Sequence, residues 1–186
     1  MFDYKSTSDA IVSEIQQALD RVSSEEVDRL IDDLLSADKV FVFAVGRVLL
    51  ALECLGKRLG HFGIDCQIVG SINEKPIRPG DLMLIASGSG ESRLPAEIAR
   101  IAKSKGAKLA LITSARESTI KSISDVVVHL PCPTKNDASA GTPSTQSMST
   151  LFDQSLHIFG DVISIAIQHH KSLKSDELWK YHANLE

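Results

Sequence analysis

The sequence lacks the features that define several large classes of protein. Its three cysteines, Cys54, Cys66 and Cys132, are an odd number without metal-type spacing, so we expect neither structural disulfides nor a metal site. No window holds the roughly 18 uninterrupted apolar residues of a membrane span, and the N-terminus has no apolar stretch like that of a signal peptide. A net charge of −4 argues against a nucleic-acid surface. We therefore expect a cytoplasmic protein, with no membrane or nucleic-acid partner, whose cysteines are small buried apolar residues.

Two nucleotide-binding signatures are also missing. Gly88 and Gly90 lack the third glycine of the dinucleotide fingerprint, because Arg93 stands in its place. The sequence contains no G-x-x-x-x-G-K-[ST] run. A phosphate bound by this chain is therefore expected to belong to a small molecule and not to a nucleotide.

The most informative stretch is the serine turn, residues 87–92, which reads Ser-Gly-Ser-Gly-Glu-Ser. An apolar run precedes it and a helical pattern follows, which predicts a buried strand, a tight turn and the start of a helix. Glycines allow the backbone to approach a ligand closely, and the N–H groups of a helix start favour an anion. A phosphate monoester is thus the expected ligand, although an ordinary helix cap is the alternative. The expected binding residues of this turn are Ser87, Gly88, Ser89 and Ser92.

Hydrophobic periodicity divides most of the chain into alternating strands and helices. Continuous apolar runs, typical of strands buried on both faces, lie at 40–44, 66–69, 82–86, 109–113 and 126–130. Helical patterns lie at 47–62, 92–105 and 117–124, and an irregular loop covers 70–80. This alternation predicts an α/β fold, a three-layer α/β/α sandwich around a five-stranded parallel sheet. With the flavodoxin-like strand order 2-1-3-4-5, loop 44–47 would face the serine turn at the switch point.

We expect a single domain over residues 1–186, since a chain of this length can bury one substantial core. A helical segment, 1–37, comes first, and Ser23-x-x-Glu26 resembles a capping box that opens its second helix. The αβα core covers 38–170 and a tail covers 171–186.

Two segments of the core leave alternatives open. Residues 131–147 are rich in proline and other helix breakers, which suits either a substrate lid or a plain surface connection. Helix 148–170 carries enough apolar residues to pack on another subunit or to cover its own sheet.

Several motifs together resemble the 6-phospho-3-hexuloisomerases, which carry the sugar-isomerase (SIS) domain. Besides the serine turn they are Asp125-Val126-Val127-Val128, Pro131-x-Pro133-Thr134-Lys135, Leu151-Phe152-Asp153-Gln154-Ser155-Leu156 and His182-Ala183-Asn184-Leu185-Glu186. The resemblance spans nearly the whole chain. It implies an α/β/α sandwich assembled as a homo-oligomer, commonly a homotetramer. It also implies interconversion of 3-hexulose 6-phosphate and fructose 6-phosphate without metal or cofactor.

The chain departs from this family near the expected sugar end of the site. Where the family has Gly-x-Gly-Arg-Ser-Gly, only Gly46 and Arg47 remain, and Val48 replaces a hydroxyl. Asp153 stands where the family has glutamate, which draws the carboxylate back by about 1 Å and can cost about a hundredfold in rate. A SIS isomerase for another sugar phosphate, or a SIS protein that binds a sugar phosphate without turnover, therefore remains an alternative.

Moving a ketone between adjacent carbons of a sugar needs a proton shift through an enediol, with one base for carbon and another group for the oxygen protons. The catalytic candidates are Asp153, Glu91 and His182. Glu91 could equally well cap the helix. His182 would be an idle tail residue by default, and the resemblance implies that it serves the site of a neighbouring subunit. Arg47, beside Gly46, is expected to pair with the phosphate or a sugar oxygen, and Lys135 is a weaker candidate that is more often solvated.

Overall fold

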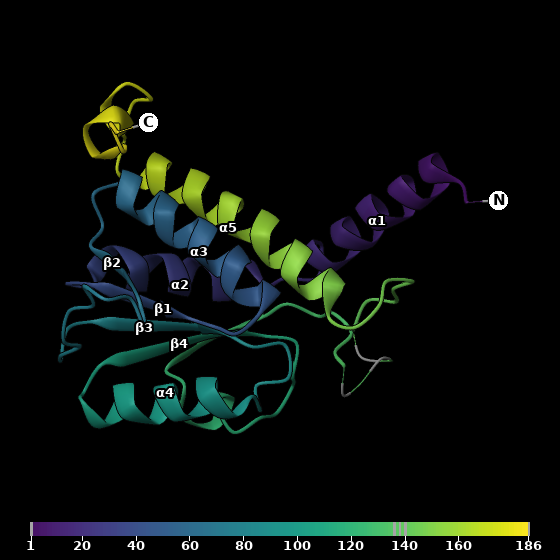
Figure 1. Ribbon diagram of the computed structural model, residues 1–186, viewed down its shortest axis with the longest axis horizontal. Coiled ribbons are helices and arrows are strands. Elements are labelled where there is room, and N and C mark those ends of the chain that lie inside the picture. The colour runs from purple at the N-terminus through teal and green to yellow at the C-terminus, as the bar shows by residue number, and fades with distance from the viewer. Residues whose placement is uncertain (1, 136, 138, 140, 186) are drawn as a thin grey trace.

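The computed structural model, which describes residues 2–135, 137, 139 and 141–185, contains a five-stranded parallel sheet (Figure 1). The strands are β1 (Val40–Phe43), β2 (Cys66–Ile68), β3 (Leu82–Ala86), β4 (Lys108–Thr113) and β5 (Val126–His129). Their order is β2-β1-β3-β4-β5, and every pairing is parallel. The predicted α/β fold and the flavodoxin-like order are confirmed. Strand β2 lies on one side of β1, and β3 to β5 follow on the other side. The topological switch point therefore lies between β1 and β3, whose carboxyl ends are side by side.

Helices cover both faces of the sheet and produce the three layers (Figure 1). One face carries α1 (Tyr4–Leu19), α2 (Ser24–Ser36), α3 (Arg47–His61) and α5 (Thr150–His170), and the other carries α4 (Arg93–Ser104). Successive side chains of a strand point to opposite faces. Accordingly, Val42 and Leu84 belong to the core under α3 and α5, whereas Phe41 and Ile85 pack toward α4.

Two expected local structures are absent. The helix predicted at 117–124 is wrong, because only a 3-10 turn, η1 (Lys121–Ile123), forms there. The backbone N–H of Ile120 donates to Gly90 O at 3.2 Å, so it is not used within a helix. The predicted capping box is also wrong, since the Ser23 side chain makes no capping bond. Glu26 instead accepts a hydrogen bond from His129 N at 2.8 Å and ties α2 to β5.

The prediction that all five strands are buried on both faces is correct for the central strands β1, β3 and β4 and wrong for the edge strands. The edge strands β2 and β5 are only partly buried, because each has a neighbouring strand on one side only. Cys132 is buried as expected, Cys66 is half-buried, and Cys54 is exposed on the outer side of α3. Burial raises the pKa of the Cys66 and Cys132 thiols to about 12.

Helix α5 packs on α3, α1 and α2 of its own chain and buries its inner side in the core on that face of the sheet. Its inward side chains, among them Phe152, Phe159 and Ile163, are buried in the core. On its outer side Ile158, Val162 and Ile165 remain exposed. A role of this outer side in packing on another subunit therefore stays a prediction. No helix within the described ranges is long and apolar enough to cross a membrane.

Candidate active site

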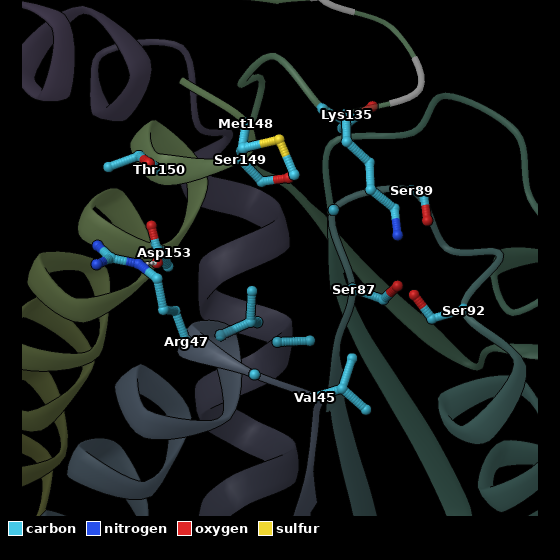
Figure 2. Close-up of a pocket in the computed structure, with 15 residues that line it drawn as sticks. Val45, Arg47, Ser87, Ser89, Ser92, Lys135, Met148, Ser149, Thr150 and Asp153 are labelled. Carbon is cyan, nitrogen blue, oxygen red and sulfur yellow. Dashed lines mark hydrogen bonds and ion pairs between the residues drawn. The ribbon is translucent and has the colours of Figure 1, made fainter. Parts of the chain in front are cut away.

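The loops that follow β1 and β3 meet at the switch point and enclose a pocket of about 300 Å³ (Figure 2). Gly46 precedes α3 with a φ of 62°, a left-handed conformation that favours glycine. The serine turn forms the opposite wall, and the start of α5 closes the third side. The lining residues central to the argument are Arg47, Ser87, Ser89, Ser92, Lys135 and Asp153.

The serine turn is held by its own hydrogen bonds. Gly90 N donates to the carbonyl and to the hydroxyl of Ser87, both at 3.1 Å. Gly90 has a φ of 63°, and an added Cβ would lie 2.1 Å from the Ser118 hydroxyl oxygen. The turn therefore requires glycine at position 90. Gly88 has no such conformation, and a Cβ there would make only ordinary contacts, the shortest at 3.5 Å to Thr134.

The turn and the start of α4 present donors that the protein leaves unused. Within the part of the chain that the structure describes, the backbone N–H groups of Ser89, Ser92, Arg93 and Leu94 donate no hydrogen bond. Ser92 is the N-cap residue of α4, yet its hydroxyl makes no capping bond. Figure 2 shows the hydroxyls of Ser87 and Ser92 facing the same space. Unused donors at a helix N-terminus suit an anion.

Lys135, which the sequence offers as a weaker phosphate candidate, is an exposed residue at the rim of the pocket. The structure places it in the pocket wall, and Figure 2 shows its ammonium group directed toward Ser89. Lys135 makes no ion pair within the described residues. Its position depends on the loop after β5, which brings a residue far along the chain opposite the serine turn.

We expect Lys135→Gln to weaken the binding of fructose 6-phosphate by roughly tenfold, because a charge-assisted contact to the phosphate is lost. Isothermal titration calorimetry measures this change. Lys105→Gln is the matched control, since Lys105 is an exposed lysine beyond the end of α4. Equal losses in the two variants would show a general charge effect and contradict the placement of Lys135 on the phosphate.

A buried carboxylate lies on the side of the pocket formed by α5. Asp153 is 6% exposed, and its Oδ2 accepts a hydrogen bond from Nε of Arg47, the first residue of α3. Its Oδ1 is also buried and has no hydrogen-bond partner among the described residues. A buried oxygen without a partner is costly, which indicates that a ligand completes this site. Arg47 thus pairs with Asp153 in the structure, and its contact with the phosphate or a sugar oxygen stays a prediction.

The structure does not bring Glu91 into the pocket lining. Its carboxylate accepts hydrogen bonds from the backbone N–H of Thr119 at 2.6 Å and from the Thr119 hydroxyl at 2.7 Å. These bonds hold the pKa of Glu91 below its usual range. Glu91 thus joins the serine turn to the segment before β5, and it is not bonded to the helix N–H groups.

His182 lies at the opposite end of α3 from the pocket of its own chain. Its ring follows the short turn η2 (Glu177–Tyr181) and stacks on the ring of His61 with centroids 4.9 Å apart. His61 ends the 15-residue helix that Arg47 begins, so the two ends are about 20 Å apart. Within one chain His182 does not reach Asp153. Its predicted role in a neighbouring subunit stays a prediction.

The arrangement combines anion donors on one wall with a buried carboxylate on another. The remaining lining is partly apolar and includes Val45, Val48 and Met148. Among the described residues, no group of three His, Cys, Asp or Glu side chains could hold a metal ion. The pocket can therefore bind a small phosphorylated molecule and expose its carbon atoms to a carboxylate base.

The chain is similar to known proteins of a single family. The SIS domain family matches residues 33–158, a range that includes the serine turn and Asp153. The chain therefore belongs to the SIS domain family. It is 34% identical to the 3-hexulose-6-phosphate isomerase of Bacillus subtilis over 95% of each chain. It is 33% identical to the enzyme of the same name from Mycobacterium gastri, over 93% of this chain and 86% of the other.

The fold is also similar to that of a solved structure. A protein of Methanococcus jannaschii, for which the function of a 3-hexulose-6-phosphate isomerase has been inferred, superposes with a TM-score of 0.83. The match covers 97% of this chain and 99% of that one, at 25% identity. Within the SIS class the chain is thus a member of the 6-phospho-3-hexuloisomerase family, as its motifs predicted.

Proposed function

We propose that the protein interconverts 3-hexulose 6-phosphate and fructose 6-phosphate through an enediol. The observation that carries this proposal is that one pocket is lined both by the serine turn, with its unused N–H donors, and by Asp153. The Asp153 carboxylate is buried, and only one of its two oxygens has a hydrogen-bond partner among the described residues. The relatives named 3-hexulose-6-phosphate isomerases support it. The serine turn and Lys135 would hold the phosphate, and the sugar chain would extend toward Arg47 and Asp153.

The open-chain form of the substrate suits this pocket. With its 6-hydroxyl phosphorylated, 3-hexulose 6-phosphate cannot readily close a five-membered ring, so its reacting carbons remain accessible. Asp153 removes the proton from C2 while the C2–H electron pair forms the C2–C3 double bond and the C3 oxygen takes up a proton. The C2 oxygen then loses its proton, the C2 carbonyl forms, and Asp153 returns the carbon proton to C3. Arg47 stabilises the negative charge of Asp153 and lies where it can contact the enediol oxygens.

We expect the double variant Ser87→Ala, Ser89→Ala to bind fructose 6-phosphate roughly ten- to hundredfold more weakly, because two hydroxyl donors to the phosphate are lost. Unphosphorylated fructose should bind poorly to both proteins. Calorimetry measures both ligands, and Ser122→Ala, which removes an exposed hydroxyl on η1, is the control. Equal affinity of the unmodified protein for fructose and its phosphate would contradict the assignment.

The alternative functions are separated by measuring binding and turnover together. Val48 and the shortened carboxylate of Asp153 favour either a different sugar phosphate or a protein that binds without turnover. A panel of pentose, hexulose and heptose phosphates distinguishes these cases. Binding without turnover of any member would identify a sugar-phosphate sensor and would contradict the isomerase.

We also propose that the protein works as a cytoplasmic homo-oligomer, a dimer or a tetramer. The support is the exposed apolar outer side of α5, formed by Ile158, Val162 and Ile165. Light scattering on the purified protein measures the number of subunits.

A further inference from the structure

A buried carboxylate on α1 has no part in the chemistry proposed above. Glu14 is 7% exposed, although most of α1 is exposed and its N-terminal half projects away from the sheet (Figure 1). Its carboxylate accepts four hydrogen bonds, all from the breaker-rich segment before α5. The donors are Ser144 Oγ at 2.7 Å, Thr145 N at 2.8 Å, Thr145 Oγ1 at 2.8 Å and Gln146 Nε2 at 3.0 Å.

These donors lie immediately before residues that line the pocket. Met148, Ser149 and Thr150 follow them along the chain, and all three contact the cavity. Met148 has a φ of 61°, an uncommon conformation for a residue with a side chain, which the surrounding structure must maintain. The segment is also tied to the turn after α1, where Arg21 donates to Gly141 O at 3.3 Å. Helix α1 and the turn that follows it therefore hold the chain at two places before the pocket-lining residues 148–150.

Simple packing does not account for a carboxylate at this position. Burial alone raises the pKa of Glu14, and the hydrogen bonds from Thr145, Ser144 and Gln146 outweigh it, so the pKa lies below its usual range. Glu14 makes no ion pair with a lysine or arginine among the described residues. A buried charge that only neutral donors compensate is costly unless its hydrogen bonds are complete. The four bonds thus fix residues 144–146 in one arrangement.

We propose that Glu14 is a positioning residue that fixes residues 144–149 against α1 and thereby sets the affinity of the pocket for its phosphorylated sugar. The proposal rests on the proposed function of the pocket. Glu14 does not line the pocket, so it acts through the backbone of Met148 and Ser149. This assigns residues 144–147 to the support of the pocket wall and not to a plain surface connection.

The test is Glu14→Gln. Each oxygen of the Glu14 carboxylate accepts two hydrogen bonds. Glutamine keeps one of these oxygens and replaces the other with an NH2 group, which cannot accept the two bonds made there. We expect KM and Kd for fructose 6-phosphate to rise roughly tenfold, with kcat changed less than about twofold. Hydrogen exchange of the amides of 144–150 should become faster. Asp33→Asn is the control, because Asp33 is an equally buried carboxylate on α2 that pairs with Lys108 away from the pocket.

A double-mutant cycle with Thr145→Val keeps the test valid if one variant is partly unfolded. Glu14→Gln combined with Thr145→Val should bind no more weakly than the worse single variant, because both remove the same contact. Fully additive losses would overturn the proposal, and so would faster exchange at 144–150 with unchanged Kd. If the unmodified protein does not bind fructose 6-phosphate, the proposed function fails instead. The affinity for inorganic phosphate, compared between the unmodified protein and Glu14→Gln, then tests the positioning role separately.

Discussion

Asp153→Asn is expected to reduce isomerase turnover by about a thousandfold while Kd for fructose 6-phosphate changes only a few fold. A positioned general base contributes about a hundred- to ten-thousandfold to such reactions, and an amide cannot accept the carbon proton. Affinity should persist because the proposed phosphate contacts, the serine turn and Lys135, lie on the opposite wall of the pocket. A coupled assay of fructose 6-phosphate formation measures turnover, and calorimetry measures affinity.

The conservative variant sharpens this prediction. Asp153→Glu should retain turnover or raise it on the hexulose, since it restores the longer side chain typical of the family. Asp161→Asn is the matched control, because Asp161 is an exposed aspartate on the same helix. An Asn variant at position 153 with undiminished turnover would show that another group, Glu91 or His182, is the base.

The second large effect concerns the C-terminal tail. His182 lies about 20 Å from the pocket of its own chain, measured along α3. If it handles the oxygen protons, it must do so in another subunit, where an imidazole is well suited near neutral pH. A variant lacking residues 182–186 and the Asp153→Asn variant should each be nearly inactive alone.

Mixing these two variants under conditions that exchange subunits should restore part of the activity. Some sites in the mixed oligomers would combine an intact Asp153 from one chain with an intact tail from the other. Each variant exchanged with itself is the control, and activity per oligomer is the measurement. Mixed oligomers without recovered activity, or a protein that is monomeric in solution, would contradict a shared site.

Local patterns explain why the elements of the fold were predictable. The buried strands β1, β3 and β4 are continuous apolar runs, and a strand inside a three-layer sandwich requires such a run whatever its neighbours are. The serine turn was predictable because a buried strand, glycine and a helix start are adjacent in the sequence. The helix predicted at 117–124 failed because Ile120 N bonds to Gly90, which only the folded chain brings near.

The side-chain contacts at and near the pocket were not predictable in the same way, because their members are distant in the sequence. Arg47 and Asp153 are 106 residues apart, and Glu14 and Thr145 are 131 apart. The position of Lys135 beside the pocket depends on the path of the loop after β5, which the sequence does not show. Periodicity within a window carries no information about such contacts, since they depend on how the layers pack.

The sequence by itself therefore determined the α/β class, the serine turn and the family, because each is written in neighbouring residues. The tertiary structure alone decided that Asp153 is buried beside Arg47 and that Lys135 faces the serine turn. It also decided that Glu14 is hydrogen-bonded to residues 144–146 and that His182 lies at the far end of α3. The physical reason is that burial and hydrogen bonding between distant segments arise only when the helices are packed on the sheet.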